Sequence, residues 1–146
     1  MSLVAPYSAE QVLLAYMVGQ ATSGTQILKL YTNDYDPAGD VQNCVAASFV
    51  EATGVPGYTA ATLSQSSWLL ITDTLHHYTA QYSAAQTFTF TSASTGVSVY
   101  GYYVVVPHGA SSYQDRLLWC ERFAGAPFSM PSSGGTIAVT PRITLN

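Results

Sequence analysis

Charged side chains are scarce in this sequence. Asp, Glu, Lys and Arg make up only 8% of its 146 residues, whereas soluble domains average about 25%. A small domain usually needs mixed surface charge to stay in solution, so a surface of Ser, Thr, Ala, Gly and Tyr suggests burial against copies of itself or a partner. A monomeric β-protein that is simply low in charge fits the composition equally well.

Positive charge is the rarest kind. The fixed cations are Lys29, Arg116, Arg122 and Arg142, and the net charge is −4. Nucleic-acid binding depends on clustered Lys and Arg, so we expect no nucleic-acid partner. No apolar run approaches the roughly 20 residues that cross a bilayer, so we expect no membrane partner either.

Targeting and redox signals are also missing. The opening MSLVAPYSAE lacks the basic and apolar regions of a signal peptide, so we expect the chain to be made in a cytoplasm and kept there until it assembles. Cys44 and Cys120 lack CxxC spacing and define neither a disulfide framework nor a zinc site. The sequence leaves their pairing open, and buried thiols in a reducing compartment are the favoured interpretation.

Motifs for catalysis and cofactor binding are absent. There is no GxSxG nucleophile elbow and no glycine-rich phosphate loop. His76 and His77 are adjacent, so on a strand they point to opposite faces, and His108 follows Pro107 in an expected loop. We therefore predict no catalytic residues, no metal ligands and no cofactor, and interpret the chain as a non-enzyme.

One acidic segment invites a calcium interpretation. Asp34, Asp36 and Gly39 stand at the first, third and sixth positions of an EF-hand-like loop. The match then fails, because Ala38 replaces an oxygen ligand and Val45 replaces the bidentate Glu. A surface turn capped by Asp side chains is the preferred interpretation.

Glu51 and Glu121 could form a carboxylate pair of the glycosidase kind if their strands were neighbours. Each lies in a strand pattern beside apolar or aromatic residues, and Glu121 precedes Arg122. Structural carboxylates held by hydrogen bonds or ion pairs are the better interpretation.

The stretch from Thr95 to Phe123 organises the expected fold. Its first half, TGVSVYGYYVVVP, is rich in β-branched and aromatic residues and ends at Pro107, which cannot donate to a strand ladder. Its second half alternates, with Leu117, Trp119 and Glu121 on one face. We predict that the two halves form the central hairpin of an antiparallel sheet.

Other segments complete an all-β domain. Turn formers separate further expected strands at 27–32, Ala46–Glu51, Tyr58–Leu63, Ser67–Thr72, His77–Tyr82, Gln86–Thr91, Phe128–Met130 and Gly135–Leu145. These nine or ten strands predict a single domain over residues 1–146, an antiparallel β-sandwich of jelly-roll type. Ser8 and Gln11 resemble a capping box and precede apolar residues at helical spacing, which predicts one short N-terminal helix.

Eleven tyrosines and two tryptophans favour two kinds of surface. Aromatic platforms bind sugars, and Tyr31, Tyr35, Trp68 and Tyr113 could supply them. Tyrosine is equally typical of protein interfaces. The candidates for an interface are Tyr7, Tyr100, Tyr102, Tyr103 and Tyr113. For Tyr100, Tyr102 and Tyr103, the sequence leaves core and interface open.

The order of short motifs resembles a known class of protein. These motifs are LLAYMV, ILKLYTND, FVEATGVPGYTAATL, SSW, TFTFT, VYGYYVV, LLWCERF and TIAVTPRITL. Together they resemble small structural proteins of tailed-bacteriophage virions, in particular capsid decoration (cement) proteins. The most specific part is the pairing of VYGYYVV with LLWCERF across a polar loop.

The resemblance implies a structural role on the virion. A jelly-roll homotrimer would sit on the outer capsid surface, bind the major capsid protein and clamp the shell without catalysis. The apolar segment Ser2–Tyr7 could then lie on the capsid or on a neighbouring subunit. The alternatives are a fibre or tail-associated module that binds host-surface glycans and, more remotely, a small hydrolase.

Overall fold

The computed structural model describes residues 25–72, 78–107 and 115–144, together with Leu13, Ala15 and Val18. Its strands are β1 (Gln26–Tyr31), β2 (Ala61–Leu63), β3 (Trp68–Thr72), β4 (Tyr78–Tyr82), β5 (Gln86–Phe90), β6 (Ser98–Val99), β7 (Gly101–Val106), β8 (Arg116–Arg122), β9 (Phe128–Ser129), β10 (Gly135–Val139) and β11 (Arg142–Thr144). The short 3₁₀ helices are η2 (Ala46–Ser48), η3 (Gln65–Ser67) and η4 (Ser92–Ser94). Every strand pair is antiparallel, so the expected all-β, antiparallel class is confirmed.

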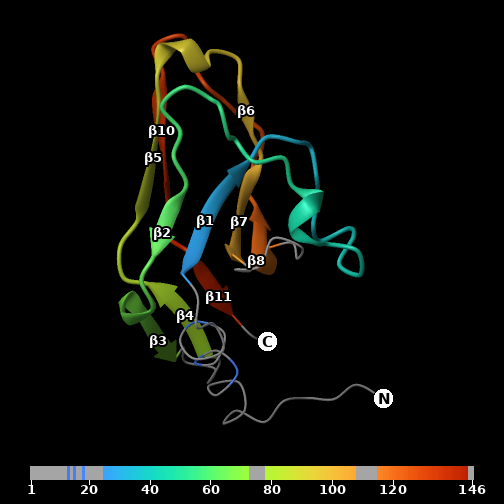
Figure 1. Ribbon diagram of the computed structural model, residues 1–146, viewed down its shortest axis with the longest axis vertical. Helices are drawn as coiled ribbons and strands as arrows, with labels where there is room; N and C mark the ends of the chain where they lie inside the picture. The colour runs from blue at the N-terminus through green and yellow to red at the C-terminus, as the bar shows by residue number, and fades with distance from the viewer. Residues whose placement is uncertain are drawn as a thin grey trace.

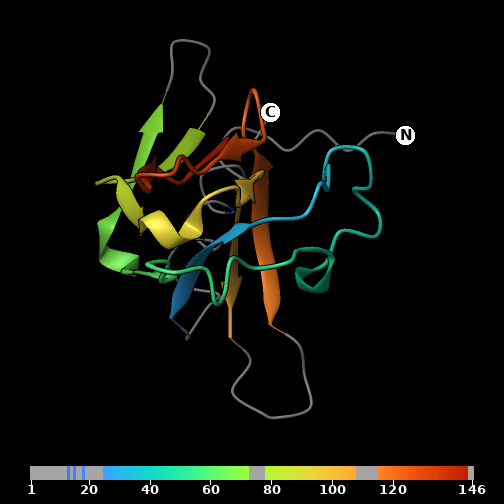
Figure 2. The same ribbon diagram turned by 90° about the horizontal axis from the view of Figure 1, so that it is seen from above.

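The described strands form four sheets. The largest has the order β2-β1-β7-β8, and the others are β11-β4-β3, β10-β5 and β6-β9. In Figure 1, β5 and β10 lie on one side of the four-stranded sheet, while the segment 33–51 lies on the other. Figure 2 shows the same arrangement from above, with segment 33–51 standing apart from β3, β4 and β5.

The four-stranded sheet is covered on both faces, because its side chains alternate between two apolar clusters. Leu28, Leu30 and Val104 point into the main core, which they share with side chains of β4, β5 and β10. Tyr31 and Tyr103 point into a second cluster that segment 33–51 completes from outside. We call this second cluster the outer cluster. All of β7 is buried as a result, which explains its unbroken GYYVVV run.

The predicted hairpin is present, but it is not central. β7 and β8 pair from Gly101 opposite Arg122 to Val106 opposite Arg116. Within the described residues, β8 pairs only with β7 and stands at the edge of its sheet. The first predicted strand is too long, because the chain divides at Tyr100 and β6 pairs with β9 in a separate sheet. A register shift between Val104 and Val105 also separates Leu117, in the outer cluster, from Trp119, at the main core, so the two do not share the expected face.

Three further expected strands need correction. The range Ala46–Glu51 forms η2 over Ala46–Ser48 and only an isolated bridge from Glu51 to Tyr31. Here the Val45 amide donates to Ser48 Oγ at 3.3 Å and the Ser48 amide donates to Val45 O at 2.9 Å. These local hydrogen bonds replace strand pairing. Tyr58–Leu63 contributes only the three residues of β2. Pro141 divides the expected closing strand into β10 and β11, as a residue without an amide hydrogen must.

The predicted N-terminal helix lies almost entirely outside the described residues. Val18, one of the few that are described, is 4% exposed, and its carbonyl accepts a hydrogen bond from Gln26 Nε2 at 3.3 Å. In the described part of the chain, no helix has the length and hydropathy needed to cross a bilayer.

Candidate functional site

Two of the predicted interface tyrosines belong to the interior. Tyr102 is 2% exposed and faces the main core, where its hydroxyl donates to Glu121 Oε2 at 2.7 Å. Tyr103 is 4% exposed and faces the outer cluster, where its ring stacks on Phe49 with centroids 4.6 Å apart. Burial raises the pKa of both phenols. Neither ring is available to a partner, so the core interpretation replaces the interface one for this pair.

Tyr100 lies in a different environment from its neighbours. It falls between β6 and β7 and is half-buried. The Arg122 guanidinium stands over its ring, 5.0 Å from the centroid. Tyr100 therefore keeps some exposed surface and remains an interface candidate. Tyr7 and Tyr113, the other two candidates, lie outside the described residues.

Three of the four aromatic residues named for a sugar platform are described, and they do not form one; the fourth, Tyr113, lies outside the described residues. Tyr31 is fully buried, and Trp68 is 8% exposed, with its Nε1 donating to Gln26 Oε1 at 2.9 Å. Tyr35 is half-buried and meets Phe49 edge to face, with centroids 5.2 Å apart. These three rings fill the interior or the outer cluster, so none presents an open face to a ligand.

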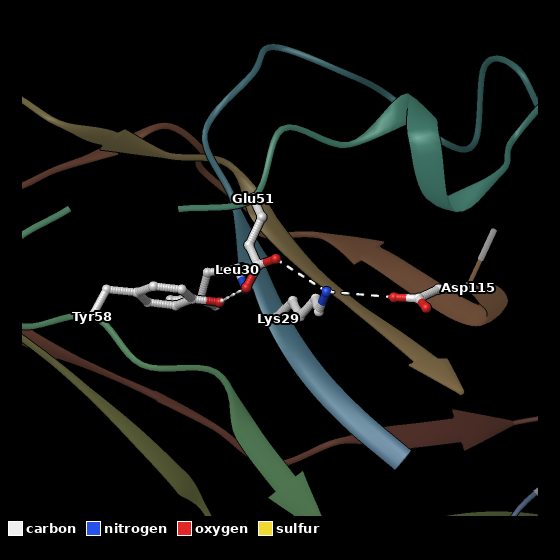
Figure 3. Close-up of polar contacts among 5 residues, drawn as sticks. All are labelled: Lys29, Leu30, Glu51, Tyr58 and Asp115. Atoms are coloured by element: carbon white, nitrogen blue, oxygen red, sulfur yellow. Dashed lines mark hydrogen bonds and ion pairs between the residues drawn. The ribbon is translucent and has the colours of Figure 1, made fainter. Parts of the chain in front are cut away.

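Glu51 is the centre of a polar cluster beside β1. Its Oε2 lies 3.0 Å from Lys29 Nζ, which also approaches Asp115 Oδ2 at 3.6 Å. The Tyr58 hydroxyl donates to Glu51 Oε1 at 3.3 Å and accepts from the Leu30 amide at 3.1 Å. Figure 3 shows Lys29 reaching between the two carboxylates while Tyr58 approaches Glu51 from the other side. Glu51 is thus held as a structural carboxylate.

The two glutamates are not brought together. Glu51 pairs with Tyr31, Tyr31 with Gly101, and Gly101 with Arg122. Three strand spacings therefore separate Glu51 from the Glu121 region, about 14 Å at 4.7–4.9 Å per spacing. Their side chains also point to opposite faces, because Glu121 pairs with Tyr102 one residue along. Glycosidase pairs lie about 5–9.5 Å apart, so this arrangement does not provide one.

The acidic segment forms the expected capped turn. Asp34 Oδ1 lies 2.7 Å from Arg122 Nη2. Asp36 Oδ1 accepts from the Ala38 amide at 3.0 Å, and Asp40 Oδ2 accepts from the Tyr35 hydroxyl at 3.2 Å. Each carboxylate is thus engaged by a different donor. Among residues 25–72, 78–107 and 115–144, no group of three His, Cys, Asp or Glu side chains is placed to hold a metal ion. His76, His77 and His108 lie outside those ranges.

Cys44 and Cys120 meet, although 76 positions separate them in the chain. Their Sγ atoms are 3.7 Å apart, and both residues are free thiols of intermediate burial. Burial raises the pKa of the Cys120 thiol to about 12. Both cysteines line a groove of about 760 Å³ between the start of segment 33–51 and β8.

Three consecutive apolar side chains of β3 are exposed. Leu69, Leu70 and Ile71 are 51%, 39% and 42% exposed. Within the described residues, β3 pairs only with β4 and is an edge strand. The sequence predicted this strand but not its role. The signal was available, because Leu-Leu-Ile is an unbroken apolar run where a half-buried strand would alternate.

A second apolar feature lies beside β9 and β10. A groove of about 550 Å³ is lined there by Phe123, Phe128, Met130 and Ile137 among others. The Phe128 ring is 45% exposed and meets Phe123 edge to face, with centroids 5.7 Å apart. The sequence predicts a strand at Phe128 but indicates no functional role for it.

Comparison with known proteins adds no assignment. No family model, curated protein or solved structure matches this chain.

Proposed function

We propose that this chain is a structural virion protein of the capsid decoration (cement) type. It associates as a homotrimer, binds the outer surface of a shell built by a major capsid protein, and stabilises that shell without catalysis. In this role the domain folds as a jelly-roll sandwich with a short N-terminal helix. Support for a sandwich comes from β5 and β10, whose side chains share the main core with β1 and β7.

The observation that carries the proposal is the apolar edge strand β3. Leu69, Leu70 and Ile71 are exposed together on β3, which is the last strand in the sheet order β11-β4-β3. An exposed edge offers unpaired backbone groups to another chain, and proteins usually protect such edges with Lys, Pro or a bulge. None of these stands within Trp68–Thr72. Such a strand suits permanent contact with a second protein surface.

The distribution of charge supports the same function. The described carboxylates are each engaged within the chain, at Asp34, Asp36, Asp40, Glu51, Asp115 and Glu121. These carboxylates therefore make contacts within the fold. The surface as a whole is short of charge, because charged residues make up only 8% of the sequence, a composition that agrees with extensive contact between subunits.

Native mass spectrometry at low micromolar concentration tests the self-association. We expect a stable trimer for the natural chain. A double variant, Leu69→Lys with Ile71→Lys, places two charges on the same face of β3 and should weaken assembly at least about tenfold, since Lys blocks edge pairing. Val41→Lys is the matched control, because Val41 is 75% exposed in a loop, and it should remain trimeric.

A monomeric natural chain, or a double variant that still assembles, would contradict the role of β3. Binding to the capsid is a separate measurement. Co-sedimentation with purified tailed-phage heads should retain the natural chain and lose the double variant. Failure to bind any such head, with trimerisation intact, would overturn the decoration role alone.

A glycan-binding fibre module is the second candidate, and the apolar groove beside β9 and β10, which Phe128 lines, favours it. The exposed Phe128 ring could stack on a sugar, with the groove beside it. Binding on a glycan array that Phe128→Ala abolishes would support this alternative. If no glycan on the array is bound and the chain binds purified phage heads, the capsid decoration role is favoured.

A further inference from the structure

We propose that Cys44 and Cys120 are the site of an intrachain disulfide, formed when the folded chain meets a low-molecular-weight disulfide such as oxidised glutathione. The bond would tie segment 33–51 to β8 across the outer cluster. The bond can form whether or not the chain binds a capsid.

The two sulfurs are already positioned for this reaction. Their separation of 3.7 Å must shorten to about 2.05 Å, the length of a disulfide. Cys120 is held by strand pairing opposite Tyr103. Cys44 lies in an irregular segment before η2, so a modest adjustment there can bring the sulfurs together.

The surrounding contacts keep Cys44 close to β8. Arg122, two residues after Cys120, binds Asp34 Oδ1 at 2.7 Å and donates from Nη1 to Tyr35 O at 3.1 Å. On the far side of Cys44, Phe49 stacks on Tyr103. Segment 33–51 is thus anchored on both sides of Cys44, which raises the effective concentration of one thiol at the other.

An oxidant can reach the pair. Cys44 and Cys120 both line the groove of about 760 Å³ described above, and neither residue is fully buried. Apolar and polar residues share the lining, among them Leu117, Trp119 and Glu121. The thiols are therefore unlike the inert cysteines that are sealed in a protein core.

The reaction balances in two exchange steps. The Cys44 thiolate attacks one sulfur of oxidised glutathione, forming a mixed disulfide and releasing one glutathione. Cys120 then loses its proton and attacks Cys44 Sγ, releasing the second glutathione. Two thiol protons and two electrons pass to the oxidant. Burial raises the pKa of Cys120 to about 12, so its thiolate is scarce at neutral pH. Cys44, in the irregular segment before η2, is placed to attack first.

The test uses the full chain, reduced, desalted and then incubated with oxidised glutathione. We expect the intact mass to fall by about 2 Da, the loss of two hydrogens, and both thiols to become resistant to iodoacetamide. Non-reducing electrophoresis should show a monomer, and peptide mapping should join the Cys44 and Cys120 peptides. Cys44→Ser and Cys120→Ser are matched controls, and each should retain one thiol able to take up one glutathionyl group.

Stability provides an independent readout. A bond that closes so long a loop restricts the unfolded chain, so the oxidised protein should melt roughly 5–15 °C above the reduced protein. The same treatment should not raise the Tm of either Ser variant. Two stable glutathionyl groups on the natural chain, covalent dimers, unchanged alkylation or an unchanged Tm would each overturn the proposal.

Discussion

Tyr58 replaces a missing strand partner. β1 pairs with β2 as far as Leu28 opposite Ala61, and its next contact on that side is the bridge from Tyr31 to Glu51. In the gap, the Leu30 amide donates to the Tyr58 hydroxyl at 3.1 Å. A side chain outside any strand thus satisfies a backbone group that would otherwise be buried without a partner.

Removing that hydroxyl should cost measurable stability. For Tyr58→Phe we expect the free energy of unfolding to fall by about 1–2 kcal/mol, because the buried Leu30 amide loses its acceptor. Urea denaturation measures the loss, and hydrogen exchange at the Leu30 amide should accelerate. Tyr100→Phe, which keeps a half-buried ring beside Arg122, should stay within about 0.5 kcal/mol. Unchanged exchange at Leu30 would contradict this role for Tyr58.

The burial of individual aromatic residues could not be predicted from the sequence. Aromatic residues could be counted, but burial depends on which face of which strand each occupies. Tyr102 and Tyr103 are adjacent and enter two different clusters. Tyr31 and Trp68, named for a sugar platform, are interior for the same reason. Only the position of the sheet between two covered faces decides these environments.

At the scale of elements, β7 and β8 approach closely at Gly101. A Cβ built there would collide with the Glu121 carbonyl oxygen and would lie 2.7 Å from the Tyr31 ring. The Tyr31 side chain, on the neighbouring strand β1, packs over the Gly101 backbone. Only glycine fits at this position, because any Cβ would clash. The Tyr31 ring fills the space that a side chain would otherwise occupy, so the strand tolerates the glycine.

Gly101→Ala should strongly disturb the four-stranded sheet. We expect a loss of about 3 kcal/mol in the free energy of unfolding, since neither a backbone carbonyl nor a buried ring can move away cheaply. Gly39→Ala is the control, because its nearest atoms would be 3.6 Å away, and it should change stability by less than about 0.5 kcal/mol. Equal effects of the two substitutions in urea denaturation would refute the close-contact explanation.

Element types were largely predictable, whereas pairings were not. Phe88 and Phe90 alternate with Thr87 and Thr89, so β5 could be recognised from local pattern. The strand predicted over Ala46–Glu51 was wrong, because the Ser48 hydroxyl accepts a hydrogen bond from the Val45 amide in place of strand pairing. The edge positions of β3 and β8 depend on long-range pairing, which no local pattern reports.

At the scale of the whole molecule, buried tyrosines make the fold sensitive to alkali. Burial raises the pKa of Tyr31 to about 12 and also raises the pKa values of Tyr58, Tyr102 and Tyr103. In the unfolded chain a tyrosine loses its proton near pH 10. Above pH 10 the unfolded state therefore binds fewer protons than the folded state, and stability falls as pH rises.

We expect stability linked to these phenols to be constant below about pH 9 and to decline from pH 10 upward. The loss should reach about 1 kcal/mol per buried tyrosine by pH 11. Urea denaturation across this range measures it, and Tyr103→Phe should show a smaller decline because one phenol is gone. Tyrosinate absorbance that titrates entirely near pH 10 in the folded protein would contradict the expectation.

The all-β class, most strand positions and the scarcity of charge are visible in the amino-acid sequence, because they follow from local alternation, turn residues and composition. Four other features depend on the folded arrangement: which tyrosines are interior, the separation of Glu51 from Glu121, the contact of Cys44 with Cys120, and the edge position of β3. Those outcomes depend on contacts between residues far apart in the chain, and such contacts arise from packing two faces of one sheet at the same time.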